Sequence, residues 1–180
     1  DIEQNCGKAE VVRKGMLKLF GSKQYSYIGF WDADLATPLE EIDYLLRFSE
    51  SENKKMILAS RLKRLGSSVQ RKTSRHIFGR VFSTFASNIL KLPVYDSQCG
   101  AKLFHSSTEE IFKEPFITKW IFDVEILARY RNKHGVANTL EDVVEVPVNA
   151  WQEIGGSKLK LKHLLKVPME LIRISKKYNA

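Results

Sequence analysis

The sequence is poor in cysteine and has no long hydrophobic run. Its 180 residues include only two cysteines, Cys6 and Cys99, which stand far apart. This pattern argues against a disulfide framework or a cysteine zinc site, and it suits a reducing cytosol. No apolar run approaches the roughly 18 to 20 residues that cross a bilayer, and no signal peptide is visible. We therefore expect no membrane-spanning helix.

Acidic residues are missing from one long stretch. No Asp or Glu stands between Asn53 and Tyr95, and the whole chain has a net charge of +8. This balance predicts an anionic partner, such as a nucleotide, a phosphorylated substrate, nucleic acid or an anionic membrane. A solvated basic face is the usual explanation. Because this run begins where a predicted strand ends, we expect some of its bases to bind phosphate, above all Arg61, Arg71 and Arg75, whose forked side chains suit phosphate oxygens.

Two carboxylates directly follow a short apolar strand. Residues 25–31 are largely apolar and aromatic, as in a strand buried in a parallel sheet. Asp32 and Asp34 come next, at the edge where open α/β sheets bind ligands. Two acids one residue apart can contact one hard cation and its phosphates, although a solvated turn is the alternative. Thr37 and Glu40 then predict a capping box that opens a helix.

The remaining patterns predict further helices and strands. Helices are expected at residues 5–20, 38–49, 74–90, 118–134 and 159–178, and strands at 25–31, 55–60, 101–104 and 143–148. Gly135 should end the fourth helix, and Pro147 suggests an edge strand. In the 74–90 helix, helical spacing predicts a core face made of large apolar side chains. They are Ile77, Val81, Phe85 and Ile89, with Phe78 and Phe82 beside them.

Two loops carry groups that could bind a ligand or take part in catalysis. Gly7 and Lys8 precede the first helix, where an amide and an ammonium could meet a phosphate; a loop glycine and a solvated lysine are the alternative. Asp96 follows the basic stretch among small polar residues. It is a candidate catalytic carboxylate, with a turn aspartate as the alternative. Asp123 and Glu125 stand in unusually apolar company for acids at a helix start.

The tail combines apolar and basic residues at helical spacing. Residues 159–178 interleave Leu, Ile, Val and Met with Lys and Arg. Such a helix can lie on an anionic membrane, or it can pack on the sheet and expose its lysines. We expect partial membrane contact.

Seven different short motifs are distributed along nearly the whole chain. They are Asn5-x-Gly7-Lys8, Asp32-Ala33-Asp34, Ser60-Arg61, Arg71 to Arg75, Asp96-Ser97-Gln98-Cys99-Gly100-x-Lys102-x-Phe104, Phe122-Asp123-Val124-Glu125 and Trp151-x-Glu153-x-x-Gly156-Ser157-Lys158. Each is weak alone, but their order and spacing together are specific. They resemble glycosyltransferase family 2, and within it the polyprenyl-phosphate sugar transferases. Dolichyl-phosphate β-glucosyltransferases are the most similar of these, and dolichyl-phosphate mannosyltransferases are more distant.

The resemblance implies a fold and an activity. The fold would be α/β and of the nucleotide-diphosphosugar (GT-A) type, with a mostly parallel sheet flanked by helices and without its N-terminal strands. Residues 1–158 would form the catalytic domain, and residues 159–180 the amphipathic tail. The activity would be the inverting transfer of a hexose, most simply glucose, from UDP-glucose rather than GDP-mannose to a polyprenyl (dolichyl) phosphate. The protein would sit peripherally on the cytoplasmic face of a membrane.

The resemblance also implies roles for single residues. Asp32 and Asp34 would bind Mg²⁺ or Mn²⁺ at the donor diphosphate. The donor would also contact Gly7, Lys8 and Arg61. Arg71 and Arg75 would bind donor or acceptor phosphates, and Asp96 would lie near the reacting groups. The lipid phosphate is already ionised near neutral pH. Positioning and charge neutralisation therefore matter more here than a strong general base.

Several features depart from the family pattern. Family members usually begin earlier, with strands and a helix that bind the base and ribose, and residue 1 here is Asp1 rather than Met. Mannosyltransferase relatives carry a metal-contacting glutamine where this chain has Ala36. Three alternatives stay open: a soluble or polysaccharide acceptor, a truncated non-catalytic homologue, and a nucleic-acid-binding module. The last lacks any recognisable motif, so we expect no nucleic-acid partner.

Overall fold

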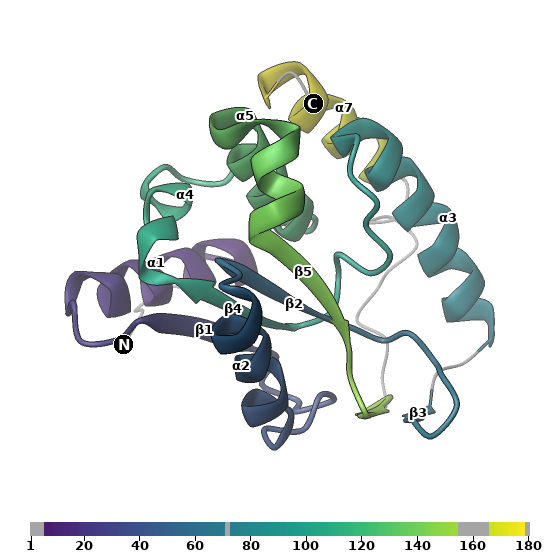
Figure 1. The fold of residues 1–180 in the computed structure, drawn as a ribbon. Helices are drawn as coiled ribbons and strands as arrows, with labels where there is room; N and C mark the ends of the chain where they lie inside the picture. Colours follow the sequence, from purple (N-terminus) through teal and green to yellow (C-terminus); the bar gives the residue numbers. More distant parts are fainter. Residues whose placement is uncertain (1–5, 71–72, 155–165, 179–180) are drawn as a thin grey trace.

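The structure, a computed structural model, describes residues 6–70, 73–154 and 166–178. Its centre is a four-stranded sheet in the order β1-β4-β2-β5 (Figure 1). The strands are β1 Tyr27–Trp31, β4 Ala101–His105, β2 Met56–Ser60 and β5 Val143–Pro147. β4 is antiparallel to both neighbours, whereas β2 and β5 pair in parallel. Three strands therefore share one direction, and the sheet is mixed because β4 is reversed between them.

The reversed strand decides where the loops meet. In the β1–β4 pair, Trp31 lies opposite Ala101. The loop that leaves β1 is therefore next to the loop that enters β4, although about seventy positions separate them in sequence. As predicted, β5 is an edge strand, and its Pro147 lies at the end of the pairing with β2.

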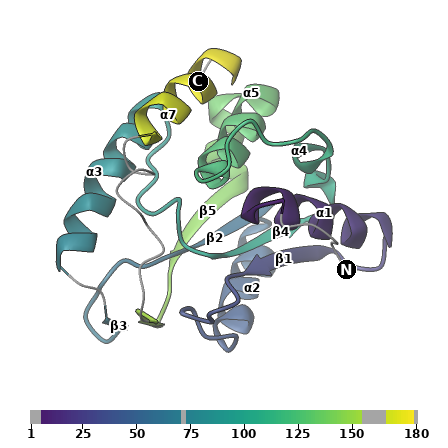
Figure 2. The ribbon, with the colours of Figure 1, turned by 180° about the vertical axis from the view of Figure 1, so that it is seen from behind.

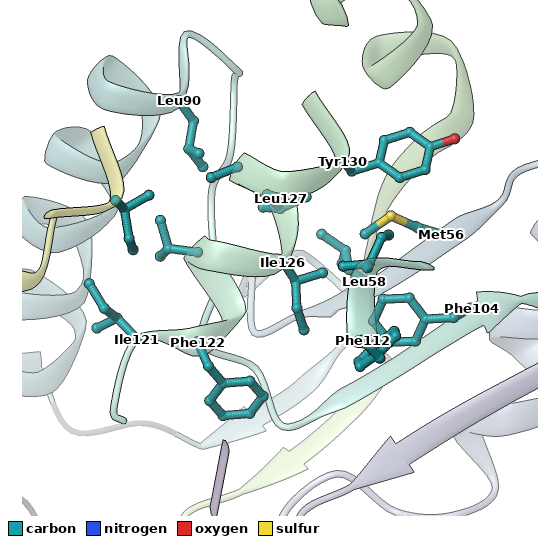
Figure 3. Packing of buried hydrophobic residues seen from close by; sticks show 14 of the residues in the cluster. Met56, Leu58, Leu90, Phe104, Phe112, Ile121, Phe122, Ile126, Leu127 and Tyr130 are labelled. Atoms are coloured by element: carbon teal, nitrogen blue, oxygen red, sulfur yellow. The ribbon is translucent and has the colours of Figure 1, made fainter. Parts of the chain in front are cut away.

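Helices cover both faces of the sheet. The helices are α1 Lys8–Gly21, α2 Glu41–Glu52, α3 Thr73–Leu90, α4 Glu110–Lys113, α5 Phe122–Asp142 and α7 Val167–Tyr178, with a short 3-10 turn at Ser106–Thr108. Alternate residues of β2 serve opposite faces: Met56 and Leu58 join the larger core with α1, α3, α5 and α7, while Ile57 and Ala59 join the smaller core with α2. Figure 2 shows α1 on the face opposite α2. Figure 3 shows how the side chains of α5 pack onto β2 and β4.

A second, two-stranded sheet lies beyond the main one. β3 Ser68–Gln70 pairs in parallel with β6 Ala150–Gln152. The buried carboxylate of Glu41 accepts hydrogen bonds from the backbone amides of Asn149 and Ala150 at 2.9–3.2 Å, and so ties α2 to β6. The sequence patterns predicted no strand at either β3 or β6.

The predicted capping box at Thr37 is wrong. α2 begins at Glu41, and the preceding residues form a turn in which the Glu41 amide donates to Pro38 O. Thr37 is buried instead. Its Oγ1 lies 3.7 Å from the Cys99 Sγ, and its carbonyl accepts the Trp31 indole N–H at 3.0 Å. The segment is fixed by these tertiary contacts, which outweigh the local capping pattern.

The expected core face of α3 is wrong for most of its large apolar side chains. The buried positions are Ser83, Ala86 and Leu90. Phe82 and Ile89 are partly buried and pack against the larger core, as predicted, whereas the other apolar side chains of the predicted face point outward. The outward side chains are Ile77, Phe78, Val81 and Phe85, which are 51–67% exposed. Helical spacing identifies an apolar face but does not say whether this domain or another surface covers it.

The two acids at the start of α5 are both buried in ion pairs. Asp123 Oδ1 lies 2.6 Å from the Lys102 Nζ, and Glu125 Oε1 lies 2.8 Å from the Arg129 Nη2. The hydroxyl of Tyr178 donates to Glu125 Oε1 at 2.9 Å and anchors the end of α7. Because each acid has a charged partner, both carboxylates can be buried among apolar residues.

α5 is kinked at one position. Gly135 takes φ 81° and ψ 168°, so the first helical segment ends there as predicted and a second segment continues to Asp142. Within residues 6–70, 73–154 and 166–178, no helix is long and apolar enough to cross a membrane.

Candidate active site

The site begins with the loop that leaves β1. The Asp32 amide donates to Gly100 O at 2.8 Å, continuing the β1–β4 ladder, and the Leu35 amide donates to Asp32 O at 3.0 Å. The Asp34 carboxylate accepts from the Ala36 amide at 3.1 Å, and Leu35 adopts φ +50°. This tight turn follows directly from the end of a sheet strand. It therefore holds both aspartates beyond the carboxyl end of β1, as predicted.

Gly100 makes room for the Asp32 carboxylate. A Cβ at position 100 would stand 2.0 Å from Asp32 Oδ2 and 2.1 Å from its Cγ. No side chain fits there while Asp32 keeps this position. The glycine between the buried Cys99 and β4 is thus a requirement of the acidic loop, not only of a turn.

Lys8 faces the same carboxylate from the start of α1. Its Nζ lies 2.5 Å from Asp32 Oδ1 and 5.7 Å from the centre of the Phe122 ring. The side chains of Lys8 and Asp32 are 48% and 39% exposed. Gly7 precedes the helix with φ 83°, a left-handed value that favours glycine. The pair is open to solvent, so a bound ligand could reach both charges.

Arg61 and Asp96 form a fork beside this loop. Arg61 donates from Nε to Asp96 Oδ2 at 2.7 Å, from Nη2 to Oδ1 at 2.6 Å, and from its backbone amide to Oδ2 at 3.0 Å. Burial opposes the charge of Arg61, but Asp96 outweighs that cost and raises the pKa of the guanidinium. The negative charge of Asp32 raises this pKa in the same direction.

Glu145 supports the Asp96 loop from β5. Its Oε2 accepts the Tyr95 amide at 2.6 Å, and its Oε1 accepts the Asp96 amide at 2.5 Å. Burial, and then the charge of Asp96, raise the pKa of Glu145 against these hydrogen bonds. Sequence reasoning missed this residue. The available signal was an acid in the middle of an otherwise apolar strand, Val143–Pro147.

Lys102 holds the other end of the same loop. Its buried ammonium donates to Cys99 O and pairs with Asp123. Residues 96–100 are therefore fixed at both ends, by Arg61 and Glu145 at Asp96 and by Lys102 at Cys99. Burial, and next the charge of Asp96, raise the pKa of the Cys99 thiol.

The loop residues fit a hard divalent cation in part. Asp32 and Asp34 offer carboxylate oxygens, which Mg²⁺ and Mn²⁺ prefer, and Gly100 leaves space for the Asp32 carboxylate. Across the described residues, no group of three or more His, Cys, Asp or Glu side chains is placed to hold a metal. A cation on these two carboxylates would therefore complete its shell with oxygens from water or from a bound phosphate.

The predicted site residues that the structure describes with their side chains lie in two neighbouring groups. Lys8, Asp32 and Asp34 lie together with Gly7 beside them, and Arg61 pairs with Asp96 on the adjoining loop. Arg71 lies outside the described residues, as do Gly156, Ser157 and Lys158 of the last motif and residues 159–165 of the predicted tail helix. Arg75 belongs to α3, but its side chain is outside the described part of the chain.

Solved structures with the same fold define the class. Glucosyl-3-phosphoglycerate synthase from Mycobacterium tuberculosis, in complex with phosphoglyceric acid, superposes with a TM-score of 0.66 at 12% identity, covering 99% of this chain and 57% of that one. The same enzyme in complex with Mn²⁺, UDP-glucose and glycerol 3-phosphate gives a TM-score of 0.64 at 13% identity, covering 96% and 55%. The fold is that of the GT-A glycosyltransferases, which confirms the predicted class.

Curated relatives narrow the class further. A dolichyl-phosphate beta-glucosyltransferase of Dictyostelium discoideum is 31% identical over 98% of this chain and 53% of its own length. One from Trichomonas vaginalis is 28% identical over 98% and 51%. No protein-family model matches the chain. The chain is homologous to dolichyl-phosphate β-glucosyltransferases, as the motifs predict, and it spans about half the length of the curated relatives it matches.

Proposed function

We propose that this protein transfers glucose from UDP-glucose to a polyprenyl phosphate of the dolichyl type. The observation that carries the proposal is similarity over 98% of the chain to proteins named for that reaction. The site adds a physical reason. Its two loop aspartates offer ligands to a divalent cation, and that cation together with Lys8 would supply the positive charge that a diphosphate donor requires. The Mn²⁺ and UDP-glucose complexes of the structural neighbour favour UDP over GDP donors.

In this proposal the side chains mainly bind and orient the sugar donor and the lipid phosphate acceptor. Gly7 and Lys8 meet the donor phosphates at the start of α1, and Arg71 and Arg75 supply charge for the donor or acceptor phosphate. Asp96 is held rigidly by Arg61 and Glu145, so it can orient a sugar hydroxyl or the acceptor without moving. Because Arg61 is bound to Asp96, its contact with the donor would be electrostatic and indirect, not a direct fork on phosphate.

The reaction is a displacement at the anomeric carbon of glucose. An oxygen of the lipid phosphate attacks that carbon, the bond to the β-phosphate oxygen of UDP breaks, and UDP leaves with the electron pair. Attack from the opposite side inverts the anomeric centre. A Mg²⁺ or Mn²⁺ ion held by Asp32 and Asp34 would offset the charge of the leaving diphosphate. Lys8, 2.5 Å from Asp32, adds positive charge at the same position.

The proposal includes a location. A polyprenyl phosphate acceptor resides in a membrane, so the protein would act as a peripheral protein on a cytoplasmic membrane face. The exposed cations of α7, among them Arg173, Lys176 and Lys177, support contact with anionic lipid. The residue range 159–180 would serve as the membrane-proximal tail.

Calorimetric titration tests the donor site. The chain is titrated with UDP-glucose and with GDP-mannose, first with Mn²⁺ and then with EDTA, and the titrations are repeated on Asp34→Ala. We expect metal-dependent binding of UDP-glucose that the variant loses. Equal binding in EDTA, or in Asp34→Ala, would contradict the assigned metal role. If the folded chain binds neither donor, the same titration of a version extended at its N-terminus decides whether the donor assignment stands.

A further inference from the structure

Arg80 connects α3 to the segment that carries Asp96. The chain leaves α3 at Leu90 and turns back toward the sheet (Figure 1). There the Arg80 Nη1 donates to the backbone carbonyl of Tyr95 at 3.0 Å. The same guanidinium lies 3.6 Å from the centre of the Tyr95 ring, close enough for a cation–π contact. One side chain of α3 thus holds, in two ways, the residue directly before Asp96.

A second contact joins α3 to the same segment. Ser87 Oγ donates to Val94 O at 2.7 Å, and the Val94 amide donates back to Ser87 Oγ at 3.1 Å. Ser87 and Arg80 both belong to α3, so one helix holds two consecutive residues, Val94 and Tyr95. The segment just before Asp96 therefore follows the position of α3.

Two opposite charges hold one peptide group beside Asp96. The Tyr95 carbonyl and the Asp96 amide belong to the same planar peptide unit. Its carbonyl accepts from Arg80, and its N–H donates to Glu145 Oε1 at 2.5 Å. Both hydrogen bonds involve a charged group, and such bonds are stronger than those between neutral groups. The plane cannot rotate without breaking both bonds, so it fixes the direction in which the Asp96 side chain leaves the backbone.

Three elements meet at this point of the chain. Arg61, at the end of β2, pairs with both carboxylate oxygens of Asp96, and Glu145 comes from β5. Of the three residues that hold Tyr95 and Asp96, Arg80 is the one that comes from a helix. It therefore links the site at the sheet edge to α3.

We infer that Arg80 is a positioning residue for Asp96 in the proposed transfer. It sets the peptide plane before Asp96 and ties that plane to α3, the helix that also carries Arg75. Arg80 follows Arg75 by little more than one helical turn. A phosphate bound at the start of α3 and a group oriented by Asp96 would therefore keep a fixed distance during the reaction. The reaction rests on the proposed function, whereas the placement of Asp96 rests on the contacts above.

Hydrogen exchange measured at single amides by NMR tests the placement without any substrate. Arg80→Met keeps the length of the side chain and removes its charge. We expect the amides of Tyr95 and Asp96 to exchange about tenfold faster or more relative to the amide of Leu58 in β2. An equal change at all three amides would show global destabilisation alone and overturn the inference. Unchanged exchange at Tyr95 and Asp96 would overturn it too.

Arg13 provides a matched control. It is a partly buried arginine of α1 that also donates to backbone carbonyls, Phe112 O at 3.3 Å and Lys113 O at 2.9 Å. Figure 1 shows α1 and α4 on the side of the molecule away from α3. Arg13→Met should leave the relative exchange at Tyr95 and Asp96 unchanged. Arg80→Lys keeps a donor and a positive charge, so it should recover much of the protection.

Steady-state kinetics with UDP-glucose, Mn²⁺ and a polyprenyl phosphate test the consequence for the reaction. Arg80→Met should lower kcat by about tenfold or more, because Asp96 loses its fixed orientation. Calorimetry should give a Kd for UDP-glucose within about twofold of the parent value, since Lys8 and Asp32 lie on other segments. Arg80→Lys should recover part of kcat, and Arg13→Met should retain it. Equal kcat for Arg80→Met and Arg13→Met would overturn the positioning role, as would a loss of donor affinity as large as the loss of kcat.

The two proposals can fail separately. If the parent chain binds no donor and transfers no glucose, the proposed function fails, while local exchange at Tyr95 and Asp96 still decides the placement. If the parent is active and Arg80→Met exchanges and reacts as the parent does, the positioning role alone fails.

Discussion

At the carboxyl end of β1, the Asp32 carboxylate occupies the space beside Gly100 that the side chain of any other residue would need. The Asp32 carboxylate lies where a Cβ on residue 100 would stand, 2.0 Å from Oδ2. The contact arises because β4 runs antiparallel to β1 and places its entry loop beside the acidic loop. The position of a candidate metal ligand is thus set by a residue about seventy positions away in sequence that has no side chain.

Gly100→Ala should displace Asp32 and weaken the donor site. The added methyl overlaps the carboxylate, so the side chain must rotate away. We expect metal-dependent binding of UDP-glucose to fall by about tenfold or more, the usual effect of disturbing a residue that orients a ligand. Calorimetric titration measures the change. The matched control is Gly15→Ala in α1, where a Cβ meets nothing within 4 Å. It should leave binding unchanged and stabilise the fold by about 0.5–1 kcal/mol. Equal binding by Gly100→Ala and Gly15→Ala would contradict the proposed position of Asp32.

Asp96→Ala should destabilise the protein strongly. It leaves the largely buried Arg61 guanidinium without its carboxylate, and breaking such a pair costs about 3–5 kcal/mol. Arg61→Met removes the other charge of the pair, and Arg61→Met/Asp96→Ala removes both, so the double variant should lose less stability than the sum of the two single variants. Urea denaturation monitored by fluorescence gives the free energies of unfolding. Strict additivity of the two single substitutions would show that the fork does not couple the two residues.

Lys8→Ala should separate binding from stability. The Lys8–Asp32 pair is close to half exposed, so its loss should change the free energy of unfolding by less than about 1 kcal/mol. UDP-glucose binding should nevertheless weaken, because the proposal assigns the Lys8 ammonium to the donor phosphates. The control is Lys14→Ala on the same helix, whose ammonium is 3.9 Å from Glu10. If Lys8→Ala and Lys14→Ala bind the donor equally, Lys8 has no role in that site.

Tyr178 should make stability depend on alkaline pH. Burial, and then its hydrogen bond to Glu125, raise the pKa of Tyr178 to about 12, above the ordinary value of about 10. Its contribution is present below pH about 10, where both states are protonated, and is lost as pH rises toward about 12. Above pH about 10, only the unfolded state loses the proton readily. Urea midpoints across this range should fall less steeply for Tyr178→Phe than for the parent. Identical slopes would place the Tyr178 hydroxyl outside the Glu125 network.

Local pattern was enough for much of the fold. The apolar runs at β1, β2, β4 and β5 and the helical spacing in α1, α3 and α5 all predicted the elements found there, because backbone periodicity follows from the chain itself. The same pattern correctly placed Asp32 and Asp34 at the end of a strand. The expected burial of that strand in a parallel sheet is wrong, because β1 is an edge strand antiparallel to β4 and only Ile28 in it is buried. The order of short motifs identified the family, which the relatives then confirmed.

Contacts between distant residues decided what local pattern could not. The reversed direction of β4 brings Gly100 to Asp32, and the fork joins Arg61 to Asp96 across the sheet edge. Thr37 is held by Cys99 rather than serving as a helix cap.

The sequence by itself determined the elements, the net charge and the family resemblance, since each is a property of residue type and spacing. Only the tertiary structure decided which side of α3 is buried and which charges pair. Periodicity marks an apolar face without naming what covers it, and a charge finds its partner only when the strands have been placed. The outward face of Ile77, Phe78, Val81 and Phe85 is the clearest case, because the same spacing that predicted a core helix here forms a surface.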